Sequence, residues 1–308
     1  MGAPKTADLM IYIAKAKKKT AKAKPLALGT AMSQAVKVDL TRGLTRFKQR
    51  VNPADIEHAL KTGGYQAIMR TIPWEKLPED LDPLQASLLK ATRGGADAAN
   101  NALPARIRST LRYDSKNPKI ATRTLTLAGT RANRAITVLQ DGTLDAVRHA
   151  THRAMTEALS PKDVADSIRS SIGLNRPQAQ ALANYREKLR DTAMSESRRQ
   201  KLADGYENRL LDQRAMLIAR TEVRSAINGG QLDVWQTAMA DGLLPAKSRK
   251  VWRVDGRPCD ICEKMDGIAV DFDEAWTVPR PHGGTQQCMI PSDSHPNCMC
   301  QMMLDMGG

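Results

Sequence analysis

The sequence predicts a mainly α-helical protein that ends in a small α/β or β-hairpin module. Two observations favour helices: aromatic residues make up only 4% of the 308 residues, and Ala, Leu, Arg and Met are abundant. A third sets the end of the chain apart, because all five cysteines lie between residues 259 and 300. We therefore expect a helical body with a basic N-terminal arm and a C-terminal module stapled by zinc.

The net charge of +14 is divided unevenly along the chain. Residues 251–308 hold four Lys or Arg against nine Asp or Glu, a net charge of −5, so the first 250 residues carry +19. The first 50 residues alone hold twelve basic and two acidic residues. A chain of this sign attracts polyanions at long range, and nucleic acid is the default candidate. A solvated tail that only aids solubility is the alternative.

The basic arm, residues 1–50, concentrates its lysines in one short segment. Helix is permitted from Thr6 to about Lys24, and Pro25 is expected to end it. The candidate nucleic-acid-binding residues are Lys15, Lys17, Lys18, Lys19, Lys22 and Lys24. No run approaches the ~20 apolar residues needed to cross a bilayer, so we expect no membrane contact and a protein made in cytosol.

Residues 51–118 are predicted to form short helices joined by turns, and no chemistry is assigned to them. Helices are expected at Ala54–Lys61 and Pro83–Thr92. Prolines and pairs of glycines, such as Gly94-Gly95, are expected to separate these helices.

The helical signal strengthens in residues 119–244, which we predict to form the helical body. Helices are expected at Thr130–Gln140 and Thr143–Ala158. A long helix is predicted from about Asp204 to Ala240, and Gly229-Gly230 is the point where it could be interrupted.

Two shorter helices between these carry recognisable start and stop residues. Ser160 favours a helix start, and Gly173 favours a helix stop. Between them, apolar residues at four-residue spacing predict a buried stripe: Val164, Ile168 and Ile172. Asn175 followed by Gln178 resembles a capping box for the next helix.

The long helix is expected to be anchored to the C-terminal module rather than to carry a catalytic residue. Arg220 and Glu222 are two positions apart and so cannot face each other on a helix. The residues expected to act as structural anchors are Arg220, Glu222, Asn228, Trp235 and Trp252. The two tryptophans are predicted to be buried where the helix packs on the module.

The module, residues 245–308, begins where composition, charge sign and periodicity change together. Lys250–Val254 has strand propensity, and Asp255-Gly256 is a turn signal. We therefore expect Cys259-x-x-Cys262 on a hairpin turn that brings both sulfurs to one side.

The second cysteine group offers more donors than one tetrahedral ion can use. The candidate metal ligands are Cys259, Cys262, His295, Cys298 and Cys300, five donors for the four places of a structural Zn²⁺ site. If the second segment is a strand, Cys298 and Cys300 share a face and complete a four-thiolate site. If it turns, His295 and Cys298 are the better pair. Cys288 and His282 are interpreted as bystanders.

A catalytic role for the metal is disfavoured by the residues that surround the cysteines. The zinc nucleobase deaminases combine a PCxxC segment with an upstream His-x-Glu, and no such triplet occurs here. HExxH is absent as well. A site closed by four Cys and His ligands usually stabilises rather than catalyses. A zinc-dependent hydrolase or toxin-like enzyme is the lesser alternative, with His282 or an unligated His295 as its general base.

Several segments, taken in order, resemble the phage head morphogenesis, or minor head protein, family whose namesake is the F protein of phage Mu. They are Gly173–Ala179, Ile218–Glu222 with Ala226, Asn228 and Gly229, Trp252, Asp255–Cys262, Gly267 and His295–Cys300. The last is similar to the family's HPxCRC, with Met299 where Arg is usual. The resemblance covers roughly residues 120–302.

The resemblance implies a virion protein present in few copies inside the capsid at the portal vertex, made in the host cytoplasm. Its implied partners are the portal protein and/or the major capsid protein, and viral DNA through the basic arm. Its implied role is capsid assembly, with DNA packaging or ejection as a further expectation. A cellular nucleic-acid-binding protein with a zinc-ribbon end is the alternative.

Overall fold

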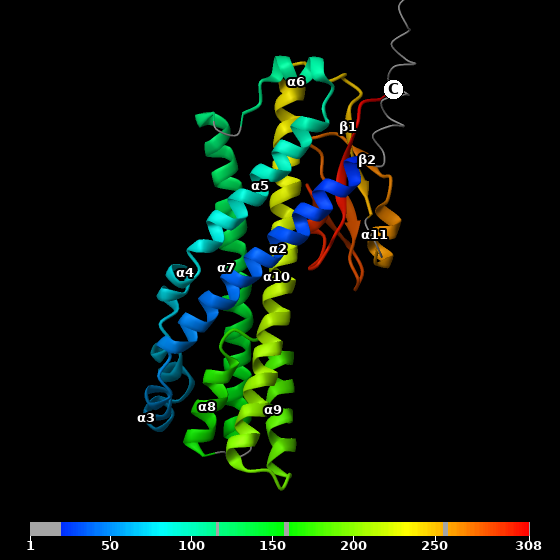
Figure 1. Ribbon diagram of the computed structural model, residues 1–308. Helices are drawn as coiled ribbons and strands as arrows, with labels where there is room; N and C mark the ends of the chain where they lie inside the picture. Colours follow the sequence, from blue (N-terminus) through cyan, green and yellow to red (C-terminus); the bar gives the residue numbers. More distant parts are fainter. Residues whose placement is uncertain (1–19, 115–116, 157–159, 255–257, 308) are drawn as a thin grey trace, which may run out of the picture. The chain divides into compact units, whose positions relative to one another are not determined.

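The computed structural model describes residues 20–114, 117–156, 160–254 and 258–307. These residues are mainly helical, as predicted, and their strands all lie in the last quarter of the chain (Figure 1). None of the helices among them combines the length and apolar character required to cross a bilayer. Contacts divide the chain into two compact units: unit 1 comprises residues 1–36, 85–132 and 217–308, and unit 2 comprises residues 37–84 and 133–216. Both units are discontinuous in sequence, whereas the predicted segments are continuous.

The elements follow in chain order. The α-helices are α2 (Thr20–Arg50), α3 (Pro53–Thr71), α4 (Leu77–Asp80), α5 (Pro83–Ala102), α6 (Ala105–Leu111), α7 (Pro118–Thr156), α8 (Pro161–Ser171), α9 (Arg176–Arg190), α10 (Glu196–Ala240) and α11 (Asp260–Met265). Short 3-10 helices are η1 (Trp74–Lys76) and η2 (Pro291–Asp293). The strands are β1 (Arg249–Arg253), β2 (Ala269–Val270), β3 (Trp276–Pro279), β4 (Thr285–Cys288) and β5 (Gln301–Asp305).

Helix α2 corrects the prediction that Pro25 ends a helix, because α2 runs from Thr20 through Pro25 to Arg50. Proline removes one backbone donor and is tolerated best near a helix start. Pro25 is the sixth residue of the described part of α2, beyond a first turn, so α2 continues there at the cost of one intrahelical hydrogen bond. The burial of Leu40 and Phe47, both at most 1% exposed, stabilises the rest of α2 through tertiary packing.

In unit 1, helices α5 and α10 cross at glycines that were predicted to break them. A Cβ on Gly95 would lie 2.2 Å from the carbonyl oxygen of Ile227, and one on Gly230 would lie 2.0 Å from the carbonyl oxygen of Thr92. Both helices continue through these positions, so the predicted break at Gly94-Gly95 is wrong and α10 is not interrupted at Gly229-Gly230. Glycine serves here for the close approach of two backbones.

In unit 2, helix α7 replaces the two helices predicted between residues 130 and 158. Buried Arg214 of α10 donates to the carbonyl oxygens of Val138 (3.0 Å) and Gly173 (2.9 Å). A Cβ on Gly142 would lie 2.3 Å from Nη2 of Arg214, so this glycine makes room for the guanidinium without ending α7. Burial lowers the pKa of Arg214 to about 10.

The predicted capping residues of unit 2 are confirmed. The Ser160 hydroxyl accepts from the backbone N–H of Asp163 (3.2 Å), and Asn175 and Gln178 form a reciprocal capping box. Gly173 has a φ of +84°, as expected of a helix stop. The stripe is buried at Val164, Ile168 and Ile172.

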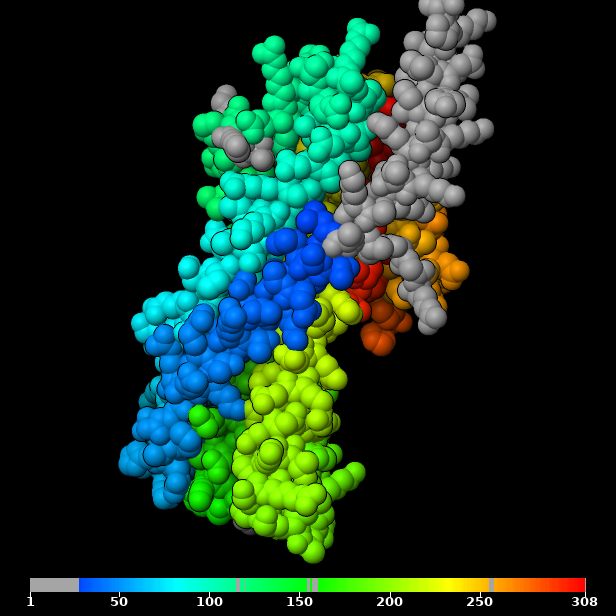
Figure 2. All heavy atoms as spheres, in the orientation of Figure 1, coloured from blue at the N-terminus to red at the C-terminus, as the bar shows by residue number. Residues whose placement is uncertain are grey.

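Helix α2 also packs along α10 within unit 2. Lys37 of α2 forms an ion pair with Asp212 (2.8 Å), and Lys48 forms one with Glu207. Figure 2 shows the blue surface of α2 beside the yellow-green surface of α10.

The C-terminal strands lie in unit 1 and form two small antiparallel sheets. One has the order β2-β1-β5, with Trp252 opposite Met302, and the other pairs β3 with β4. Trp252 contacts Trp276 edge to face, with ring centroids 5.5 Å apart. Trp235 of α10 lies in the same hydrophobic core, which confirms that both predicted tryptophans are buried there.

Lys250 of β1 is an unexpected member of this module, because its side chain is fully buried. Its ammonium group donates to the carbonyl oxygens of Met289 (3.0 Å) and Phe272 (3.3 Å) and lies 4.7 Å from the ring centroid of Trp276. Burial lowers the pKa of Lys250 to about 8. The cation therefore links β1 to the segment between β2 and β3, which holds Phe272, and to the segment after β4, which holds Met289. Neither segment is a partner of β1 in its sheet.

Candidate metal centre

The first two candidate ligands lie at the start of a helix. Cys259 occupies the N-cap position of α11, and Cys262 lies inside it. The prediction of a hairpin turn for Cys259-x-x-Cys262 is therefore wrong, and the turn signal Asp255-Gly256 lies outside the described residues. One helical turn separates the two cysteines, so both sulfurs face the same side, as the hairpin was expected to achieve.

The second group of donors lies in a turn. Asn297 has a φ of +62°, and the backbone N–H of Cys298 donates to the carbonyl oxygen of His295 (3.3 Å). Strand β5 begins only at Gln301. Of the two alternatives that the sequence left open, the turn is the one found, and it brings His295 and Cys298 to the same side.

The two groups meet, and their separations suit a tetrahedral ion. His295 Nε2 lies 3.0 Å from Cys262 Sγ and 3.3 Å from Cys259 Sγ. Cys262 Sγ lies 3.8 Å from Cys298 Sγ. Two sulfurs bound at about 2.3 Å to a tetrahedral Zn²⁺ would lie about 3.8 Å apart. The donor set and its spacing therefore fit zinc.

The fifth donor, Cys300, lies beside this set. The donor atoms of Cys262, Cys298 and Cys300 lie within 4.8 Å of one another, as do those of Cys259, Cys262 and His295. Cys262, Cys298 and Cys300 are at most 3% exposed, whereas Cys259 is exposed. Cys262 belongs to both groups and is thus at the centre of the cluster.

In the protein without metal, the pKa of each of these donors depends on its neighbours in the cluster. A hydrogen bond from Cys262 lowers the pKa of Cys298, while the nearby Cys298 raises the pKa of Cys262. The hydrogen bond with Cys298 raises the pKa of His295 to about 9. One thiolate thus forms readily and hinders ionisation of its neighbour. A divalent cation would remove that conflict, because it stabilises all the thiolates at once.

The imidazole of His295 is oriented by its own loop. Its Nδ1 lies 3.0 Å from the carbonyl oxygen of Pro296, which accepts a hydrogen bond from the Nδ1–H tautomer. When a metal ion replaces the Nε2 proton, this hydrogen bond would keep the Nε2 lone pair directed at the sulfurs. Metal-ligating histidines are commonly held in this way by a partner on the second nitrogen.

One face of α10 holds the ligand loop. The backbone N–H of Asn297 donates to Thr221 Oγ1 (2.8 Å). The Asn228 amide donates to Ser292 Oγ (3.2 Å) and to the carbonyl oxygen of Cys300 (3.3 Å). Thr221 and Asn228 are seven residues apart and so lie on the same face. Asn228 was predicted to anchor the helix to the module, and these are the contacts that it makes.

A second set of contacts joins the ligand loop, at Asp293, to α7 and α10 within unit 1. Arg131 forms a bidentate ion pair with Asp293, with distances of 2.6 and 3.0 Å. Ser225 Oγ donates to the same carboxylate (3.3 Å). Sequence reasoning missed Thr221, Ser225, Arg131 and Asp293. Two signals could have found part of this set: Thr221 lies in the family-like segment Ile218–Glu222, and Thr221, Ser225 and Asn228 recur at helical spacing.

The remaining candidate residues are placed as follows. Arg220 is exposed and Glu222 is buried, and their anchoring role stays a prediction. Cys288 is buried in β4, and neither it nor His282 belongs to a donor group among the described residues. Of the arm lysines, Lys15, Lys17, Lys18 and Lys19 lie outside the described residues, as do the side chains of Lys22 and Lys24.

Cysteine and histidine donors from α11 and from the turn before β5, beside the polar face of a long helix, form a cluster that could hold a metal ion. Residues 183–303 match the model of the family described as Phage Mu protein F like protein. The resemblance to the phage head morphogenesis family is thus confirmed over the region that holds α10 and all five donors, and it indicates a phage-head-related protein. No curated protein and no solved structure matches the chain.

Proposed function

We propose that this protein is a minor head protein of a tailed phage, a structural virion component bound near the portal and needed for capsid assembly. The observation that carries the proposal is the family match over residues 183–303. The contacts within the matched region support it. The family-like segment Ile218–Glu222 contacts the family-like segment His295–Cys300, because the backbone N–H of Asn297 donates to Thr221 Oγ1. Two segments that are far apart in the sequence therefore belong to one site.

The module is proposed to hold one structural Zn²⁺ through Cys259, Cys262, His295 and Cys298. These four donors are connected by the contacts of 3.0, 3.3 and 3.8 Å. Cys300 is assigned a supporting role beside them. When bound, zinc would fix the start of α11 to the turn before β5. The role of this chain's residues is to orient the donors and to present a rigid surface, without a catalytic step.

The uneven charge supports a division of tasks. The basic arm is proposed to contact viral DNA during packaging or ejection, because six lysines lie within ten residues there. Residues 251–308 carry −5, and the whole module, residues 245–308, carries −2 because Lys247, Arg249 and Lys250 precede that stretch; this mildly acidic module is suited to a protein partner, the portal protein or the major capsid protein. That charge disfavours a zinc ribbon that itself grips nucleic acid.

The position in the particle can be tested with purified virions or heads. A phage lacking this gene would be complemented with the wild-type protein carrying a small C-terminal tag, and labelled heads would be imaged. Label at a single vertex, together with co-purification of the portal protein, is the expected result. Label spread over the capsid surface, or normal heads without the protein, would contradict the proposal.

A further inference from the structure

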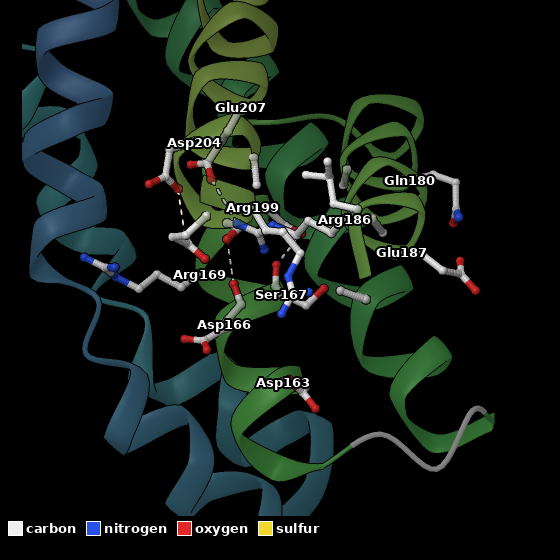
Figure 3. A pocket seen from close by; sticks show the side chains of 18 of the residues that line it. Asp163, Asp166, Ser167, Arg169, Gln180, Arg186, Glu187, Arg199, Asp204 and Glu207 are labelled. Atoms are coloured by element: carbon white, nitrogen blue, oxygen red, sulfur yellow. Dashed lines mark hydrogen bonds and ion pairs between the residues drawn. The ribbon is translucent and has the colours of Figure 1, made fainter. Parts of the chain in front are cut away.

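A polar cavity of about 810 Å³ lies within unit 2 (Figure 3). It is open to solvent on one side and is lined by α8, α9, the end of α7 and the start of α10, with Lys48 contributed by α2. Small-molecule sites commonly measure about 300–1,000 Å³, so the cavity is large enough for an organic or inorganic ligand. It is separate from the metal centre, which lies in unit 1.

Cations and carboxylates line this cavity at different depths. The half-buried cations are Lys48, Arg153, Arg169, Arg186 and Arg199. Glu207 is buried, at 4% exposed. The exposed carboxylates are Asp163, Asp166, Glu187, Glu196 and Asp204. The exposed cation Arg190 also lines the cavity and lies 3.6 Å from Asp163. Among the described lining residues, the inner wall therefore holds five cations and the single carboxylate of Glu207, while the other acidic groups are on the rim.

The ion pairs leave the inner wall with an excess of positive charge. Lys48 and Arg186 share the single carboxylate of Glu207, and Arg186 Nη2 lies 3.4 Å from it. Arg199 pairs with Glu196 (2.5 Å), whose side chain is 79% exposed and whose charge is therefore screened by solvent. Figure 3 shows Arg186, Arg199 and Glu207 turned toward the middle of the cavity, with Asp163 and Glu187 at its edge.

Two titratable groups of the cavity have lowered pKa values, mainly through burial and in part through neighbouring cations. Burial lowers the pKa of Lys48 to about 8, and the charges of Arg169 and Arg186 contribute to the lowering. Burial also lowers the pKa of His149, with further lowering by neighbouring arginines. Both groups line the cavity, and for both of them burial is the larger cause of the lowered pKa.

We propose that this cavity binds a small phosphate-bearing anion, with Arg186, Arg199 and Lys48 as its ligands. Guanidinium groups present paired donors that match phosphate oxygens, and a dianion would neutralise the cations that now share Glu207. The acidic rim selects for size. Five exposed carboxylates repel an extended polyanion such as duplex DNA, whereas a small anion passes between them and reaches the inner wall.

The test is calorimetric titration of the full-length protein with inorganic pyrophosphate at constant ionic strength, with sodium chloride as the blank. Saturable binding to one site is expected, and the absence of saturable heat would overturn the proposal. Parallel titrations with inorganic phosphate and a nucleoside diphosphate separate the two sources of the ligand chemistry. Equal affinity for pyrophosphate and the diphosphate indicates a bare phosphate site, and tighter binding of the nucleotide indicates a nucleotide site.

Variants with opposite expected effects separate recognition from general stability. Arg186→Gln, or Arg199→Gln if the first does not fold, should weaken pyrophosphate binding roughly ten-fold or more, because a charged hydrogen-bond donor is lost. Glu207→Gln should tighten it, because a competing carboxylate is removed. Lys188→Gln removes a cation from the exposed side of the same helix and should leave affinity unchanged. Equal affinities in all these variants, or weaker binding by Glu207→Gln, would sink the proposal.

Discussion

Replacing Thr221 by Val tests whether α10 positions the metal ligands. The substitution keeps the shape of the side chain and removes the hydroxyl that accepts from the Asn297 N–H (2.8 Å) and donates to the Leu217 carbonyl (2.9 Å). Asn297 lies between His295 and Cys298 in the ligand turn. Asn297 is exposed and this hydrogen bond is half-buried, so water can partly replace the lost acceptor and the turn should lose about 0.5–1.5 kcal/mol of stability.

The loss should also appear in the affinity for metal. Removing a partner that orients metal ligands typically lowers metal affinity about 10- to 100-fold. The measurement is chelator competition for zinc, combined with urea unfolding of the zinc-loaded protein. Thr221→Ser retains the hydroxyl and should behave as wild type.

Thr126→Val is the control, because Thr126 lies in unit 1, is exposed, and its hydroxyl donates to the Thr122 carbonyl of its own helix (3.0 Å). Its affinity for zinc should equal that of the wild type. If Thr221→Val and Thr126→Val bind zinc equally tightly, α10 does not position the ligands and the reasoning is refuted.

Other predictions address the ligand set, the helix crossing and the buried lysine. Cys298→Ser should lose stoichiometric zinc while Cys300→Ser keeps it, measured by elemental analysis; retention by both or loss by both would reject the proposed ligand set. Gly230→Ala should destabilise unit 1 by about 1–3 kcal/mol in urea unfolding, because its Cβ would lie 2.0 Å from the Thr92 carbonyl oxygen. Gly229→Ala, whose Cβ would lie 3.9 Å from Leu127, should be neutral or stabilising by up to about 1 kcal/mol, and equal effects at the two positions would contradict the crossing. Lys250 has a pKa of about 8 in the folded protein, against an ordinary value of 10.5. Between these pH values the unfolded chain binds more protons than the folded protein, so the stability of the wild type should rise with pH. Lys250→Met should lack this rise. The gain should be at most about 3 kcal/mol between pH 8 and 10.5, and a parallel pH dependence of the two proteins would remove the buried cation from the account.

Local signals in the sequence predicted local structure well. The Ser160 cap and the capping box of Asn175 and Gln178 were recognisable because each depends on residues at most three apart. The buried stripe Val164, Ile168 and Ile172 followed from helical periodicity alone.

The errors came from interactions between distant segments. Gly95 and Gly230 read as breaks because propensity treats glycine as a helix breaker, but here it permits two backbones to touch. Gly142 makes room for Arg214, which lies 72 positions later in the sequence. No local pattern could reveal these pairings.

The candidate metal centre was predictable in its ligands and not in its setting. Cysteine and histidine spacing identified the five donors, and the structure brings them together. The sequence left two geometries open for residues 295–300, and the turn at Asn297 decides between them. The supports from Arg131 and Thr221 depend on tertiary packing and could not be assigned beforehand.

X-ray absorption at the zinc edge of the purified full-length protein tests the central claim most directly. One tightly held zinc per chain is expected, with three sulfur ligands at about 2.3 Å and one nitrogen at about 2.0–2.1 Å. A protein purified without zinc, or a zinc signal dominated by oxygen ligands, would contradict a metal that joins Cys259 and Cys262 to His295 and Cys298.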